Sequence, residues 1–344
     1  MGAQLLSVGS AVLLSSTYTC LYVGSVILVP PFPVAAAANA TSRAAVEPVA
    51  AQPASSVTAS VPSGTALNEA RSKPRRDRND PGVIKSRLLA VSVATLAAVS
   101  SVVHTVKQHP STPRDISVTS VLVRMGLWVS QRPTWSEWVK LVCLPLGLTA
   151  SLFAGSLYVS ALTHTLPCQR YGNWHHIKQE FITLQGLRNF VWGPLTEEVL
   201  FRSCIVTLST LAGVSKAKIV FLTPLYFGLA HVHHAYETYV QGGKTARALK
   251  VSVLQTGFQL AYTTVFGWYA SFLFMRTGSI VPPFLSHSFC NVMGLPPLGW
   301  ALHEFPEHKA SLWTTYAVGI ATFCYGLWRW TEPNLFGGSV FWVV

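Results

Sequence analysis

Hydrophobic residues along this 344-residue chain gather in long windows that polar segments separate. A helix needs roughly 20 mostly apolar residues to cross a bilayer. Windows near that length lie at 5–29, 88–106, 138–162, 205–230, 251–275 and 309–328, and shorter apolar stretches lie at 119–129, 188–196 and 280–295. The pattern predicts an all-α, polytopic integral membrane bundle with about seven or eight membrane-embedded helices.

The first apolar window admits two interpretations, a signal peptide or a retained membrane helix. No charged residue precedes Arg43, so the basic flank of a signal peptide is missing. At about 25 residues the run is also longer than the apolar core of most signals. Both features favour a first membrane helix within residues 1–33, without excluding a cleaved signal.

Residues 34–77 differ in composition from the apolar windows. The segment is rich in Ala, Ser and Pro and becomes basic toward its end. It cannot bury enough apolar surface to offset its chain entropy, so we expect a disordered linker. A membrane domain at 78–335 and a short tail at 336–344 follow. A glycosylation sequon at Asn39 is present by pattern alone.

Composition and charge agree with a membrane protein. Hydrophobic residues make up 50% of the chain and charged residues only 11%, against about a quarter charged in soluble proteins. The net charge of +12 comes from basic residues concentrated in loops. Those just before Leu88 indicate a cytosolic segment, not nucleic-acid binding, and would leave the sequon unused. The six cysteines form no Cys-x-x-Cys pair, which argues against a disulfide framework and a cysteine zinc site.

Two adjacent glutamates in the second half are the first candidates for chemistry, because charged groups at membrane depth are costly and usually functional. In a helix, Glu198 and Arg202 are four residues apart and form a well-oriented ion pair. Glu197 points about 100° away from that pair. We therefore expect Glu198 and Arg202 to support the structure and Glu197 to face a water-filled cavity as a general base. The alternative is that both acids merely stabilise a helix N-terminus after Gly193-Pro194.

Histidines and an asparagine supply two further elements. His231 lies near the end of an apolar helix, before His233 and His234, and a histidine beside a carboxylate is a common acid/base pair. His287 and Asn291 share one helix face. Both can donate hydrogen bonds to an oxyanion without being charged. Interfacial histidines and a plain interhelical hydrogen bond are the structural alternatives.

These three elements, in this order and spacing, resemble the CAAX protease and bacteriocin-processing family: Glu197-Glu198-x-x-x-Arg202, Phe227-x-x-x-His231 and His287-x-x-x-Asn291. Further motifs are similar to its type II CAAX prenyl endopeptidase branch: Arg188-Asn189 before Gly193-Pro194, Phe227-Gly228-x-Ala230-His231-x-His233-His234, Arg276-Thr277-Gly278 and Ser286-His287-x-Phe289-Cys290-Asn291. The similarity covers roughly residues 78–330 and leaves out the first 77.

The resemblance implies an endopeptidase that removes the C-terminal -aaX tripeptide from farnesylated or geranylgeranylated CaaX proteins such as small GTPases. It also implies a helical bundle in the endoplasmic reticulum membrane, around a polar catalytic cavity accessible from the cytosol, and no cofactor. Glu197 and His231 would activate water, and His287 and Asn291 would form the oxyanion hole. Arg202 would orient Glu198 and the helix.

Two other functions stay open at this point. A zinc protease would draw its ligands from His231, His233, His287 and Glu197, although the chain has no His-Glu-x-x-His motif. A non-catalytic membrane scaffold or transporter would use the same polar cluster for binding. For the lipid part of a prenylated substrate, we expect a lateral opening lined by aromatic residues: Phe190, Trp192 and Phe227.

Overall fold

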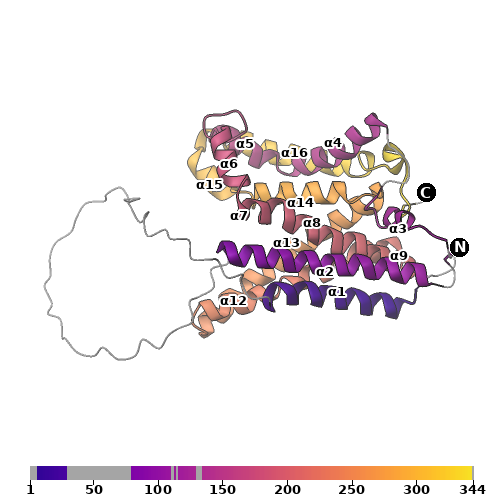
Figure 1. Ribbon diagram of the computed structural model, residues 1–344. Coiled ribbons are helices and arrows are strands. Elements are labelled where there is room, and N and C mark those ends of the chain that lie inside the picture. The colour runs from indigo at the N-terminus through magenta and orange to yellow at the C-terminus, as the bar shows by residue number, and fades with distance from the viewer. Residues whose placement is uncertain (1–5, 29–78, 110–111, 114, 129–133, 343–344) are drawn as a thin grey trace, which may run out of the picture.

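The structure is a computed structural model, and it describes residues 6–28, 79–109, 112–113, 115–128 and 134–342. Within these residues every regular element is a helix (Figure 1), which confirms the all-α prediction. All of the predicted linker at 34–77, with its sequon, lies outside the described residues.

The helices follow one another along the chain in a simple order. The first half contains α1 (Val8–Leu28), α2 (Pro81–Gln108), α3 (Val118–Arg124), α4 (Trp135–Leu152), α5 (Ala154–Leu162) and α6 (Trp174–Phe181). A continuous helical rod follows, made of α7 (Leu184–Gly186), η1 (Leu187–Trp192), α8 (Gly193–Glu198), η2 (Val199–Val206) and α9 (Thr207–Leu211). The rest comprises α10 (Lys216–Leu222), α11 (Pro224–Ala230), α12 (His233–Gln241), α13 (Ala246–Thr277), α14 (Val281–Met293), α15 (Leu298–Glu304), η3 (Pro306–His308), α16 (Lys309–Arg329) and η4 (Pro333–Phe336).

These helices pack in layers (Figure 1). On one side α4 and α5 pack against α16, and α14 packs against α4. On the other side α1 and α2 lie side by side and both contact η2. The rod and α13 run between the two sides. The largest buried apolar cluster draws on α1, α2, η2 and α11, so the first helix belongs to the core of the bundle.

Local sequence signals set the N-terminal ends of two long helices, α2 and α4. Asp80 caps α2 by accepting hydrogen bonds from the backbone N–H groups of Gly82 and Val83, and Pro81 takes the first helical position. A capping box between Thr134 and Glu137 begins α4.

Two helices, α1 and α2, are long and apolar enough to cross a membrane by length and composition. The pair α4 and α5 passes the same test together and bends by 74° at Phe153, which gives three candidate spans among the described residues. The predicted window at 205–230 is divided among short helices that include α9, α10 and α11, whereas those at 251–275 and 309–328 lie within the single long helices α13 and α16. The six long windows outnumber the candidate spans because of that division and because α13 and α16 are not among those spans.

Residues of the predicted tail at 336–344 also pack onto the bundle. Phe341 is buried against Phe274 with ring centroids 4.8 Å apart, and the Ser339 hydroxyl donates to the Met275 carbonyl over 2.5 Å. Residues of the predicted tail at 336–344 thus contact α13.

Gly319 permits close approach of α16 to the bent pair, and this contact yields a stability prediction. A Cβ at Gly319 would collide with the carbonyl oxygen of Ser151 and the side chain of Ala154. We expect Gly319→Ala to destabilise the purified protein by about 1–3 kcal/mol because the backbone has to move. Gly147→Ala on α4, where a Cβ meets nothing within 4 Å, is the matched control. Thermal unfolding in detergent measures both, and equal melting temperatures would contradict the packing argument.

Candidate active site

A break in the helical hydrogen-bond pattern precedes the two glutamates. Gly193 donates its N–H to the carbonyl of Arg188, five residues back, and Pro194 has no N–H to donate. The Asn189 carbonyl is thereby left without a helical donor. The Asn291 side chain on α14 fills the gap, with its Nδ2 2.9 Å from that carbonyl oxygen. Pro194 thus creates the acceptor that positions Asn291.

Glu198 is the fully buried centre of the charged cluster. Its Oε1 accepts a hydrogen bond from Arg202 Nη1 at 3.0 Å, so the ion pair expected from the spacing is present. The same oxygen lies 2.7 Å from His287 Nδ1. The Arg202 guanidinium sits over the ring of Phe227, 4.8 Å from its centroid. Glu198 therefore has two partners, and only one of them was predicted.

The contact with Glu198 fixes the proton arrangement of His287. A carboxylate only accepts hydrogen bonds, so Nδ1 is the donor, and a neutral imidazole then has a bare Nε2. Nε2 lies 3.7 Å from Oε2 of Glu197. His287 can donate from Nε2 only as an imidazolium. In this arrangement an oxyanion role for His287 requires the charged ring, whereas the sequence predicted an uncharged donor.

The proton arrangement of His231 is fixed as well. Its Nδ1 lies 2.8 Å from the carbonyl oxygen of Phe227, an acceptor, so Nδ1 carries the proton. In the neutral ring Nε2 is then the acceptor nitrogen. The imidazole packs edge-on against the Phe227 ring, with centroids 4.9 Å apart. This geometry suits a base that receives a proton at Nε2.

A cavity of about 680 Å³ brings these elements together. Glu197, His231 and Asn291 all line it, although they belong to different helical segments. His287 is 6% exposed and lies one layer behind Glu197 rather than on the wall. The structure therefore places three of the four expected catalytic side chains on one cavity and the fourth in contact with the first.

The expected aromatic opening is not formed by its three predicted residues. Phe190 does line the cavity. Trp192 donates its indole N–H to Ser92 on α2 over 2.7 Å, outside the cavity wall. Phe227 is only 2% exposed and packs between His231, Phe201 and Arg202. Phe227 thus packs against the charged cluster of Glu198, Arg202 and His287 and not on the cavity wall.

Several wall residues come from the first two helices, which sequence reasoning did not connect with the site. From α1 they are Tyr22, Val23 and Val26, and from α2 they are Arg87, Leu88 and Val91. The Tyr22 hydroxyl lies 3.1 Å from that of Thr196, the residue before Glu197. The sequence did contain one signal of this connection, namely polar residues such as Tyr22 inside the apolar run at 5–29. A buried hydroxyl requires a hydrogen-bond partner.

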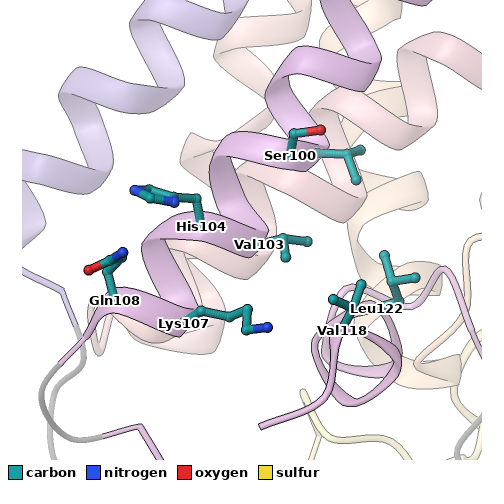
Figure 2. A pocket seen from close by; sticks show the side chains of 8 residues that line it. Ser100, Val103, His104, Lys107, Gln108, Val118 and Leu122 are labelled. Atoms are coloured by element: carbon teal, nitrogen blue, oxygen red, sulfur yellow. The ribbon is translucent and has the colours of Figure 1, made fainter. Parts of the chain in front are cut away.

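A second hollow, of about 510 Å³, lies between the C-terminal half of α2 and α3 (Figure 2). Lys107 extends toward Val118, and His104 and Gln108 also line the hollow. No carboxylate lines this hollow among the described residues. Of these two cavities, only the larger is lined by candidate catalytic residues, namely Glu197, His231 and Asn291.

The zinc alternative can be compared with the positions of the described side chains. No group of three or more His, Cys, Asp or Glu residues is arranged to hold a metal ion there. The side chain of His233, one of the four ligands considered, lies outside the described part. His231 and His287 direct Nδ1 to the Phe227 carbonyl and to Glu198, an arrangement that histidine ligands of zinc also show, so these contacts do not separate the two mechanisms.

Comparison with known proteins supplies the family. Residues 179–293, which contain all four expected catalytic residues, match the model described as type II CAAX prenyl endopeptidase Rce1-like. The chain is 35% identical over 266 residues to the probable CAAX prenyl protease 2 of Schizosaccharomyces pombe, covering 77% of this chain and 87% of that protein. The chain belongs to the CAAX prenyl protease 2 family.

Other relatives carry the same family name. The human CAAX prenyl protease 2 is 39% identical over 208 residues, which are 56% of this chain and 58% of the human protein. The Saccharomyces cerevisiae CAAX prenyl protease 2 is 30% identical over 271 residues, 74% of this chain and 84% of the yeast protein. No solved structure matches the chain. The family predicted from the motifs is confirmed, and with it the polytopic membrane fold.

Proposed function

We propose that this protein is a CAAX prenyl endopeptidase that releases the C-terminal -aaX tripeptide from farnesylated or geranylgeranylated CaaX proteins, small GTPases among them. It acts in the endoplasmic reticulum membrane, with its cavity open to the cytosol. The observation that carries the proposal is that Glu197, His231 and Asn291 line one cavity in a member of this family. The basic residues around the start of α2 support the cytosolic side.

In this proposal Glu197 and His231 activate water. The water oxygen attacks the scissile carbonyl carbon while its proton passes to Glu197 or to Nε2 of His231. The same proton then moves to the leaving nitrogen of the first aliphatic residue, so the C–N bond breaks and a carboxylate and an amine form. Such positioned proton transfer contributes about 10²- to 10⁴-fold to a rate.

Asn291 and His287 stabilise the oxyanion. One N–H of the Asn291 amide binds the Asn189 carbonyl, and the second remains for the substrate. His287 contributes as an imidazolium through Nε2. With His287 protonated, the two glutamates, Arg202 and His287 sum to zero net charge, two negative and two positive. Each donor of this kind is worth about 3–4 kcal/mol in acyl transfer.

The prenyl group lies against the apolar part of the wall in this proposal. That part combines Val23 and Val26 of α1 with Leu88 and Val91 of α2. It replaces the predicted aromatic opening as the lipid contact, because two of the three aromatic residues lie elsewhere. An apolar wall that faces a catalytic glutamate fits a substrate with a lipid next to its scissile bond.

Matched peptides test enzyme class and substrate class together. We expect purified protein to release the tripeptide from a farnesylated CaaX peptide and to cleave the unprenylated peptide at least about 10²-fold less efficiently, because a buried isoprenoid contributes several kcal/mol of binding. Release is measured by mass spectrometry. Equal cleavage of both peptides would contradict the substrate class, and no cleavage of either would favour a binding or scaffold protein.

Metal analysis of the same preparation separates the zinc alternative. We expect full activity in protein treated with a chelator, because the proposed water is held by Glu197 and His231. Stoichiometric zinc, with activity lost to chelation and restored by zinc, would instead establish a metalloprotease.

A further inference from the structure

Two arginines line the same cavity as the catalytic candidates. Arg87 on α2 is partly buried and makes no hydrogen bond or ion pair with any residue that the structure describes. Arg188 is held by amide oxygens, with Nε 2.9 Å from Asn189 Oδ1 and Nη2 3.2 Å from Asn79 Oδ1. The cavity thus presents positive charge beside Glu197, and the Arg87 guanidinium has its hydrogen-bonding capacity available for a ligand.

A carboxylate is the anion that best fits this guanidinium. Arginine binds carboxylates through a planar fork of N–H groups. Under the proposed function, the substrate ends in a free α-carboxylate that lies three residues beyond the scissile bond. Three extended residues span about 10 Å. A carboxylate at that distance can remain in the cavity of about 680 Å³ that both Arg87 and Glu197 line.

We propose that Arg87 binds the C-terminal carboxylate of the substrate and thereby selects chains that end three residues after the scissile bond. The proposal rests on the proposed function. Arg87 touches the far end of the substrate and not the reacting atoms, so it determines specificity and is not a catalytic residue. Arg188 adds positive potential on the same wall. A longer tail or a blocked C-terminus would lose this contact.

The test compares two farnesylated peptides that differ only in their C-terminus, a free acid and a carboxamide. Wild-type protein is expected to cleave the acid about 10- to 100-fold more efficiently by kcat/KM, mainly through KM, because one desolvated ion pair is lost with the amide. Arg87→Gln is expected to cleave both peptides alike, at the rate that wild type shows on the amide. Lys85→Gln removes a charge from an exposed position two residues away and should keep the wild-type preference. Arg87→Lys should retain part of it.

Each outcome decides one of two proposals. If wild type cleaves neither farnesylated peptide, the proposed endopeptidase function fails. If wild type cleaves both equally well, or Arg87→Gln keeps the preference for the acid, Arg87 does not bind the carboxylate. Equal losses on both peptides in Arg87→Gln would also overturn the role, since the effect would then be structural. Loss of the preference with cleavage of the amide unchanged establishes it.

Discussion

Replacing Glu197 with glutamine is expected to lower cleavage of a farnesylated CaaX peptide by about 10²- to 10⁴-fold. Glutamine keeps the shape of the side chain and removes the group that accepts the water proton. The Glu197 side chain is 23% exposed, and its contact with His287 is long, at 3.7 Å. Folding and membrane location should therefore remain as in wild type. The measurement is tripeptide release by equal amounts of purified protein.

An exposed glutamate, Glu180, lies just before the helical rod and provides the control for this variant. Glu180→Gln removes the same charge from a surface position at the end of α6 and should leave cleavage unchanged. Retention of more than about a tenth of wild-type activity in Glu197→Gln would remove Glu197 from the role of general base. His231 would then be the remaining group on the cavity wall able to accept a proton.

Local relations within a helix were predictable from the sequence. The pair of Glu198 with Arg202 follows from a spacing of four residues, and the structure contains it at 3.0 Å. The same spacing predicts that His287 and Asn291 point to one side of α14, and both do contact the helical rod that runs from α7 to α9. Such predictions hold because the helix itself fixes the neighbours.

Relations between distant segments were not predictable in the same way. Glu198 and His287 are 89 positions apart, and no periodic pattern relates them. The same limit applies to α1. Its residue Tyr22 contacts Thr196, which lies 174 positions later in the chain. The Phe227 ring was misplaced because an aromatic residue in an apolar window suits a core and a lipid contact equally well. Only packing distinguishes the two, and here the ring supports Arg202 and His231.

The contact of Glu198 with His287 changes the expected role of Glu198. The spacing made it a structural partner of Arg202 alone. In the structure it also accepts the Nδ1 proton of His287, and it would pair with the imidazolium that the proposed oxyanion role requires. Glu198 is thus a positioning residue in the proposed mechanism. Removing both charges of the ion pair should separate its support of Arg202 from its contact with His287.

Single substitutions at the buried pair are expected to reduce both abundance and activity. Glu198→Ala leaves the Arg202 guanidinium, whose side chain is 1% exposed, without its carboxylate, and Arg202→Ala strands Glu198 in turn. Losing one half of a buried ion pair costs about 3–5 kcal/mol. Membrane-extracted protein yield and thermal unfolding measure the first effect, and tripeptide release per folded molecule measures the second.

The double variant Glu198→Leu with Arg202→Met separates support from positioning. Replacing both charges with apolar side chains of similar size is often neutral or stabilising, so we expect yield and melting temperature to return close to wild type. Activity per folded molecule should stay at least about 10-fold lower, because His287 lacks the carboxylate that would pair with the imidazolium needed for the proposed oxyanion role. Full recovery of cleavage in the stable double variant would show that Glu198 acts only through Arg202. Persistent low activity in a stable protein would instead place the Glu198–His287 contact within the catalytic machinery.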